Sequence, residues 1–189
     1  MTDREIFIDI YKKNIQRAGS ENLLQWLNKS DFFTAPASSR FHNNVEGGLV
    51  NHSIHVYNNL KKLNEVYQTG FSEETLTIVG LLHDLCKVNY YKIDYRNVKN
   101  SSGQWVKQPY YTVDEEFPFG HGEKSCYIIQ AYMQLKREEC LAIRWHMAGF
   151  DASSRGGDFS GSNAYNKTPL CVLTSSADML ATYIDERKE

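Results

Sequence analysis

The chain has 189 residues, of which 41% are hydrophobic and 23% are charged, and this composition is typical of one folded domain rather than of a disordered chain. Its 21 basic and 23 acidic residues give a net charge of -2, so we do not expect a protein that coats nucleic acid through a basic face. We predict a single domain over residues 1–189.

The cysteines and the N-terminus both favour a reducing compartment. The four cysteines are far apart, form no Cys-x-x-Cys pair and lie in or beside apolar segments, so we expect reduced, mostly buried thiols. The first residues, MTDREIFIDIYKK, carry acids where a signal peptide needs a basic region, and no run reaches the roughly 18 apolar residues that cross a membrane. We therefore predict a cytoplasmic protein with no membrane partner.

The first half of the chain predicts four helices. Thr2 and Glu5 form a capping box before a helix over about 3–17. The fourth helix, which is apolar almost all round, indicates a buried element. Between them we expect a helix after Ser20, a connecting loop over 30–48 and a helix over about 49–68, and the fourth helix then runs from Ser72 to His83 and Asp84.

The second half predicts one β-hairpin and three further helices. Residues 89–113 are rich in aromatic and β-branched side chains around an Asn-Ser-Ser-Gly turn, so we expect a β-hairpin insertion there. The helices follow at about 122–134, at 137–148 with Gly149 as its C-cap, and from Thr168 and Pro169 to about 186, with a mobile Ser/Gly/Asn-rich loop over 151–167.

His83 and Asp84 end the apolar fourth helix and are the first candidates for chemistry. An imidazole and a carboxylate buried side by side need hydrogen bonds, cations or a metal, because unpaired they would cost several kcal/mol. A metal ion satisfies both groups at once. The alternative interpretation is a polar pair that faces solvent through the turn at the end of the helix.

Four other side chains at helix positions or helix starts complete a candidate ligand set. Imidazole and carboxylate are donors that suit Fe, Mn, Co, Ni or Zn. Taken singly, each has a structural alternative, as a helix cap, a core histidine or a solvated acid. The four are His52, His121, His146 and Asp178, the last of which shares its helix face with the small residues Cys171, Thr174 and Ala181.

The segments that carry these residues resemble a known superfamily. GGLVNHSIHV, GLLHDLCKV and the late SADML are similar to the motifs of the metal-dependent HD-domain phosphohydrolases, over about residues 30–185. FFTAPASSRFHNNVEGGLVNHS followed by LLHDLCKV is most similar to the HD domain of bacterial 3′-5′ exoribonucleases. Leu85 and Cys86 depart from the commoner His-Asp-Ile-Gly-Lys motif, and a GYP motif is missing, which disfavours a cyclic-di-GMP phosphodiesterase. The resemblance implies an all-α helical bundle, decorated here by the hairpin.

The resemblance also implies a role for each candidate residue. One or two divalent ions (Mn, Fe, Co, Ni or Zn, with Mg as a further candidate) would activate a water for attack on phosphorus, so no serine or cysteine nucleophile is required. Asp84 and Lys87 are the predicted catalytic residues, with Lys87 neutralising a phosphate oxygen. His52, His83, Asp84 and Asp178 would hold the first metal, and Asp84 would bridge to a second held by His121 and His146. Arg40, His42, Lys124, Arg144 and Lys87 are the predicted substrate-binding residues.

With these roles for its residues, the protein is predicted to hydrolyse a phosphomonoester or phosphodiester. The predicted partner is a small phosphate-containing substrate, a nucleotide or a short single-stranded nucleic acid, and a homo-oligomer is compatible with the sequence. The rival functions are an HD-fold di-iron oxygenase and a nucleotide-binding module without turnover. The aromatic residues of the hairpin have two interpretations: they stack a base at the rim of the site, or they fill the packed face of a small sheet.

Overall fold

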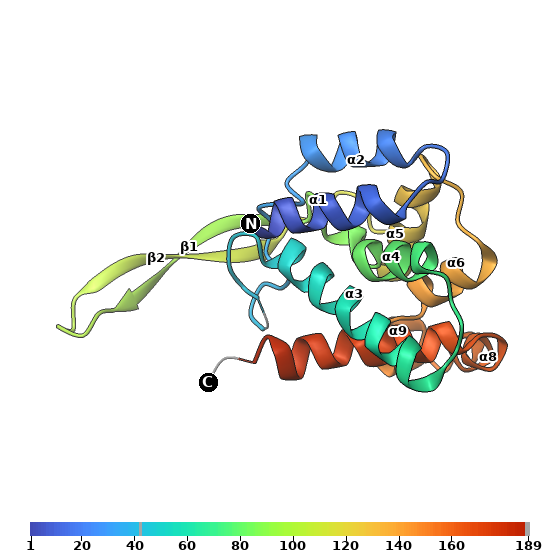
Figure 1. The fold of residues 1–189 in the computed structure, drawn as a ribbon. Coiled ribbons are helices and arrows are strands. Elements are labelled where there is room, and N and C mark those ends of the chain that lie inside the picture. The colour runs from blue at the N-terminus through green and yellow to red at the C-terminus, as the bar shows by residue number, and fades with distance from the viewer. Residues whose placement is uncertain (42, 188–189) are drawn as a thin grey trace.

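The computed structural model describes residues 1–41 and 43–187 as a bundle of helices from which one long hairpin projects (Figure 1). The predicted helical fold with a β-hairpin insertion is therefore confirmed. In chain order the elements are α1 Asp3–Asn14, α2 Ser20–Lys29, α3 Gly48–Tyr67, α4 Glu73–Leu82, the 3₁₀ turn Leu85–Lys87, β1 Tyr91–Lys99, β2 Trp105–Val113, α5 His121–Gln130, α6 Arg137–Arg144, the 3₁₀ turn Ala148–Phe150, α7 Ala152–Arg155, α8 Ser160–Lys167, α9 Pro169–Leu180 and the π-helical turn Ala181–Asp185.

Local sequence signals set the starts of the main helices. The Thr2 and Glu5 capping box forms as predicted at α1. Ser72 Oγ accepts a hydrogen bond from Thr75 N at the start of α4. Thr168 caps α9 in front of a proline at the first helical position. These side chains satisfy backbone N–H groups that have no partner within their helix.

The centre of the bundle is α4, whose residues from Thr75 to Leu82 are all buried. It packs against α3, α1 and α6, and α3 in turn packs against α9 (Figure 1). This arrangement places the end of α4, where His83 and Asp84 lie, beside the two helices that carry His52 and Asp178. None of the helices in the described chain is long and apolar enough to span a membrane. The cytoplasmic location stays a prediction.

The hairpin is an antiparallel pair with Tyr91 opposite Val113 at its base and Lys99 opposite Trp105 near its tip. It extends away from the helices (Figure 1), and most of its side chains are exposed, including Tyr95 at 61% and Trp105 at 68%. For Tyr95 and Trp105 the interpretation that the aromatic residues fill a packed face is therefore wrong, because no layer of the described chain covers the outer part of the sheet. Tyr91, Tyr110 and Tyr111, at the base of the hairpin, are half-buried.

The structure corrects two predicted boundaries. Helix α6 ends at Arg144, and Gly149 lies in the following 3₁₀ turn instead of capping the helix. Residues 151–167, predicted as a mobile loop, fold as α7 and α8. Tertiary contacts explain this, because the Tyr165 hydroxyl donates to the Trp145 carbonyl at 3.2 Å, and Asp151 both caps α7 and pairs with Arg144 at 2.8 Å. The helix propensity of the local sequence does not reveal such contacts between distant residues.

Two glycines allow the ligand-bearing helices to approach one another closely. A Cβ atom at Gly80 of α4 would lie 2.6 Å from Tyr57 Cα of α3, and one at Gly122 of α5 would lie 2.3 Å from the Arg144 carbonyl oxygen of α6. Real Cβ atoms do not make such short contacts with backbone, so neither position accepts a larger residue without displacement of a helix. The two contacts bring α3 to α4 and α5 to the end of α6.

We expect Gly122→Ala to destabilise the protein by about 1–3 kcal/mol, because the added methyl group overlaps backbone atoms that cannot rotate away. Chemical denaturation followed by circular dichroism measures this difference. Gly149→Ala is the matched control, since a Cβ there meets nothing within 4 Å. Equal stability of the two variants would show that the α5–α6 contact is not tight.

A buried ion-pair network joins the N-terminal helices to the rest of the bundle. Arg17, which follows α1, binds both carboxylate oxygens of Glu139 on α6, at 2.6 and 3.0 Å, and also pairs with Glu74 on α4 at 3.1 Å. Glu139 is fully buried and accepts further hydrogen bonds from Thr75 Oγ1 and from Lys136 N. Burial disfavours its ionised form, but the hydrogen bonds from Arg17 and Lys136 outweigh this and lower the pKa of Glu139 below 4.5.

We expect Glu139→Gln to cost about 3 kcal/mol, because it leaves Arg17 without its buried partner. The depressed pKa also gives the sign of the pH dependence. The stabilisation from Glu139 is complete above pH 4.5 and is lost as the pH falls through the lower folded-state pKa. The free energy of unfolding of the wild type should therefore fall in acid more steeply than that of Glu139→Gln. Glu138→Gln, one residue earlier in the same helix, is the control.

Candidate metal centre

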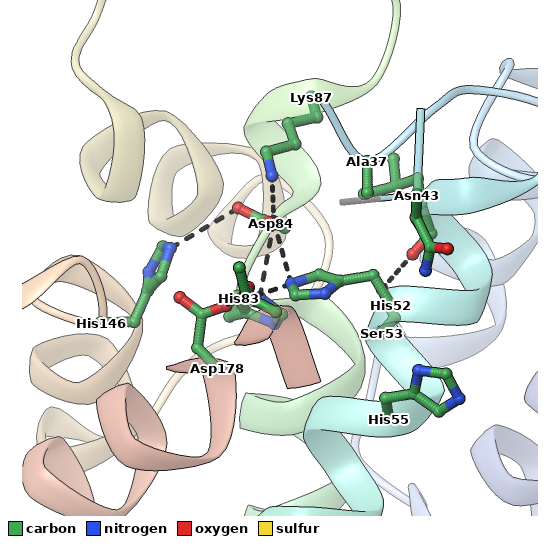
Figure 2. A network of polar contacts seen from close by, with 12 residues as sticks. Ala37, Asn43, His52, Ser53, His55, His83, Asp84, Lys87, His146 and Asp178 are labelled. Atoms are coloured by element: carbon green, nitrogen blue, oxygen red, sulfur yellow. Dashed lines mark hydrogen bonds and ion pairs between the residues drawn. The ribbon is translucent and has the colours of Figure 1, made fainter. Parts of the chain in front are cut away.

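Six polar side chains from five parts of the chain, Asp84 among them, lie close together, and Figure 2 shows four of the other five around Asp84. His83 and Asp84 follow the last turn of α4, and the remaining four come from α3, from the first position of α5, from the segment after α6, and from α9. All are buried or largely buried. The structure thus brings together all six residues predicted as metal ligands, namely His52, His83, Asp84, His121, His146 and Asp178.

The two oxygens of the Asp84 carboxylate face different groups. Oδ1 lies 2.9 Å from His121 Nε2 and 3.5 Å from His146 Nε2. Oδ2 lies 3.5 Å from His83 Nε2 and 3.7 Å from His52 Nε2. Each oxygen therefore belongs to a separate set of nitrogen donors, which is the arrangement that a carboxylate bridging two cations requires.

Backbone carbonyls orient two of the imidazole rings. His83 Nδ1 lies 3.0 Å from the Gly80 carbonyl oxygen, and His146 Nδ1 lies 2.7 Å from that of Ile143. A carbonyl oxygen can accept a hydrogen bond but cannot donate one, so the Nδ1 atom of each ring must carry a proton. The neutral ring then presents a lone pair at Nε2. These Nε2 atoms are buried and have no hydrogen-bond partner in residues 1–41 and 43–187. Buried unsatisfied nitrogen atoms aimed at a common point are donors that a cation would satisfy.

A buried glutamate orients the third ring. Glu186 Oε1 lies 2.9 Å from His52 Nδ1 and 3.1 Å from His55 Nδ1, and its side chain is fully buried. His52 Nε2 is thereby directed at Asp178 Oδ1, 3.2 Å away. Sequence reasoning missed Glu186, because only the π-helical turn after α9 returns the chain to α3. His55, which sequence reasoning left as structural, shares this contact.

The pKa shifts follow from burial and from this pairing. Burial lowers the pKa of His83 to about 3, so its ring is neutral. Burial also opposes the charged form of His52, but hydrogen bonds with Asp178 and Glu186 outweigh it and raise the pKa to about 9. In His121, the neighbouring Cys86 and Asp84 overcome burial and raise the pKa to about 10. Protons thus compete with cations for these atoms, and metal affinity should increase with pH.

The donors form three overlapping groups that could each hold an ion. In each group, one donor atom per residue lies within 4.8 Å of the others. Imidazole nitrogen and carboxylate oxygen are the donors that divalent transition metals accept, and the unsatisfied Nε2 atoms lie among them. The residues present therefore fit a metal centre. The groups are His52 with His83 and Asp178, His83 with Asp84 and His146, and Asp84 with Cys86 and His121.

Lys87 lies at the centre as predicted. Its Nζ lies 2.7 Å from Asp84 Oδ2, and its side chain is 13% exposed (Figure 2). Burial disfavours its charge, but the Asp84 carboxylate outweighs burial and raises the pKa of Lys87. Lys87 also lines a pocket of about 740 Å³ that opens over Asp84, His121, His146 and Asp178.

Three of the predicted substrate-binding residues are not among those described as lining this pocket. Arg144 stacks on the Trp145 ring and pairs with Glu123 and Asp151, so its charge is already matched. Lys124 is buried against Glu115 at 2.8 Å, and Arg40 is exposed next to Phe41 of the pocket wall. His42 lies outside the described residues. Sequence reasoning missed two cationic residues of the wall, Arg155 and Arg187, which lie in segments without any recognisable motif.

Comparison with known proteins agrees with this geometry. A family model described as the HD domain matches residues 49–183, a range that contains all six candidate ligands and the hairpin. The chain matches no curated protein and no solved structure.

Proposed function

Because this chain belongs to the HD-domain family, whose members are in general metal-dependent phosphohydrolases, we propose that it hydrolyses a phosphomonoester or phosphodiester at the Asp84 centre. The observation that carries this proposal is the division of the Asp84 oxygens between two sets of imidazole donors. His52, His83, Asp84 and Asp178 would hold one cation, and Asp84, His121 and His146 would hold a second. Bound divalent cations would polarise a phosphoryl oxygen and lower the pKa of a water near it.

The residues of the chain supply the remaining functions. The carbonyls of Gly80 and Ile143 and the carboxylate of Glu186 hold the ligand rings in one tautomer and one orientation. Lys87 Nζ, at the pocket wall beside Asp84, neutralises a phosphate oxygen of the substrate and the charge that develops on it.

The pocket suits an anionic organic substrate. Its volume of about 740 Å³ lies within the range for small-molecule sites. Besides Lys87, its wall contains two guanidinium groups, Arg155 and Arg187, and the aromatic rings of Phe41 and Phe150. Cationic groups beside aromatic rings suit a phosphate attached to a base or sugar.

The hairpin favours a nucleotide or short oligonucleotide as the substrate. It leaves the body four residues after Lys87 and returns eight residues before His121, so its base lies beside the centre. The hairpin strands and turn, 91–113, contain four basic residues and one acidic residue, although the whole chain is net negative. Tyr95, Lys99 and Trp105 share one face, and Lys99 Nζ lies 5.3 Å from the centre of the Trp105 ring. Exposed aromatic rings next to cations are typical of single-strand binding.

We expect His83→Ala and Asp84→Asn to reduce Mn²⁺-dependent hydrolysis of bis-p-nitrophenyl phosphate at least about 100-fold, since each removes a donor from the centre. Initial rates with added metal, together with metal analysis of each protein, measure this. Asp9→Asn, an exposed carboxylate on α1, should retain wild-type activity. Retained hydrolysis in both site variants would contradict the assignment of the Asp84 centre as the active site.

We expect Trp105→Ala to raise the KM for a short single-stranded oligonucleotide about tenfold, because the loss of one stacked base is worth about 1–3 kcal/mol. Hydrolysis of the small ester should not change, since Trp105 is distant from Asp84 along the hairpin. The control is Tyr67→Ala, because Tyr67 is similarly exposed, at 65%, and ends α3 on the opposite side of the body from the hairpin tip (Figure 1). An unchanged KM in Trp105→Ala would exclude the hairpin as an oligonucleotide-binding element.

A further inference from the structure

Cys86 has a different environment from the other three cysteines. Cys126 and Cys171 belong to the contiguous hydrophobic cluster of the core, and Cys140 packs against it. Cys86 is also buried, at 4% exposure, but lies outside that cluster. It lies in the 3₁₀ turn directly after Asp84, and its backbone N–H donates to Ser125 Oγ of α5 at 3.0 Å. This hydrogen bond fixes the turn against the helix that begins with His121.

The sulfur atom of Cys86 faces the donors of the metal centre. Sγ lies 3.9 Å from Asp84 Oδ1, 3.7 Å from His121 Nε2 and 3.3 Å from His121 Nδ1, and Asp84 Oδ1 and His121 Nε2 are 2.9 Å apart. Metal–nitrogen and metal–oxygen bonds of about 2.0–2.2 Å and a metal–sulfur bond of about 2.3 Å give donor separations of about 3.3–3.5 Å in a tetrahedral site. The separations of Sγ, Asp84 Oδ1 and His121 Nε2 bracket these values. Because Sγ lies nearer to Nδ1 than to Nε2, binding of one ion by these atoms also requires the His121 ring to turn.

A further donor lies beside the same oxygen of Asp84. His146 Nε2 is buried, has no hydrogen-bond partner in the described part of the chain, and lies 3.5 Å from the same Asp84 Oδ1. The rings of His121 and His146 are adjacent, with centroids 5.1 Å apart. The carboxylate of Asp84, the imidazole of His121 and the thiol of Cys86 form one group of donor atoms within 4.8 Å of one another, and His146 belongs to the neighbouring group on the same carboxylate.

We propose that Cys86 Sγ is a ligand of the cation held by Asp84 and His121. This inference rests on the proposed metal centre and adds a sulfur donor to it. As the sulfur–metal bond forms, the thiol proton passes to the solvent, and no oxidant or reductant is needed. A thiolate favours Zn²⁺ and Co²⁺ over Mn²⁺ and Mg²⁺, whereas the group of His52, His83 and Asp178 offers only nitrogen and oxygen. The two ions are thus held by sites of different metal preference.

Cobalt binding tests the proposal without any measurement of hydrolysis. Metal-free protein is titrated with Co²⁺ under anaerobic conditions, and absorption is followed in the visible region and in the near ultraviolet. We expect the wild type to develop a thiolate-to-cobalt charge-transfer band. The band should be lost in both Cys86→Ser and Cys86→Ala, while the visible bands of bound Co²⁺ remain. Cys140→Ser, which changes a half-buried thiol outside the centre, should retain the charge-transfer band.

Competition titrations provide a second readout. We expect Cys86→Ser to weaken binding of Zn²⁺ at this site by about tenfold or more and to leave the affinity for Mn²⁺ nearly unchanged. Circular dichroism establishes that the variants are folded. A charge-transfer band that persists in folded Cys86→Ser, or that is absent from cobalt-loaded wild type, overturns the inference. If that occurs while Asp84-dependent hydrolysis persists, the proposed function stands without a sulfur ligand. If the band appears but no phosphoester is hydrolysed, the ligand stands and the function is wrong.

Discussion

The carboxylate of Asp84 is the buried charge around which the rest of the molecule is arranged. Removing an ionised carboxylate from water costs several kcal/mol unless cations and hydrogen-bond donors replace the water. In this chain the replacement comes from Lys87 and from imidazoles of three other elements. Burial raises the pKa of Asp84, yet Lys87 and the histidines outweigh burial and hold that pKa well below its usual value. Asp84 therefore stays ionised, as a carboxylate that ligates metal must.

Rigid contacts between helices determine where the donors lie. The close approach at Gly80 brings α3 to α4 immediately before His83, and the one at Gly122 brings α5 to the end of α6 immediately after His121. The Arg17 and Glu139 network then joins α1, α4 and α6 away from the site. Because these contacts involve backbone or buried ion pairs, the donor atoms are held in place without relying on a metal. Such preorganisation is what a catalytic centre requires from its scaffold.

The site and the hairpin are directly connected along the chain. The turn after Asp84 supplies Cys86 and Lys87 to the centre and then continues into β1, while the return from β2 leads to His121. A bound chain that contacts the hairpin would therefore approach the pocket from the edge where Lys87 lies. The exposed aromatic residues on the hairpin are otherwise unfavourable in water, and a ligand that stacks on them gives a physical reason for their presence.

The sequence by itself determined the helical class, the caps of α1, α4 and α9, the position of the hairpin and the six candidate ligands, because capping, periodicity and the His-Asp motif are local signals. Only the tertiary structure decided three features: the helical folding of residues 151–167, the early end of α6 and the role of Glu186. Each depends on partners that are far away in the chain. The same holds for Arg144, whose charge is matched by Glu123 and Asp151, and for Arg155 and Arg187, which line the pocket. A cationic side chain has the same sequence signal whether it binds a substrate or a neighbouring acid, and only packing decides which one lies within reach.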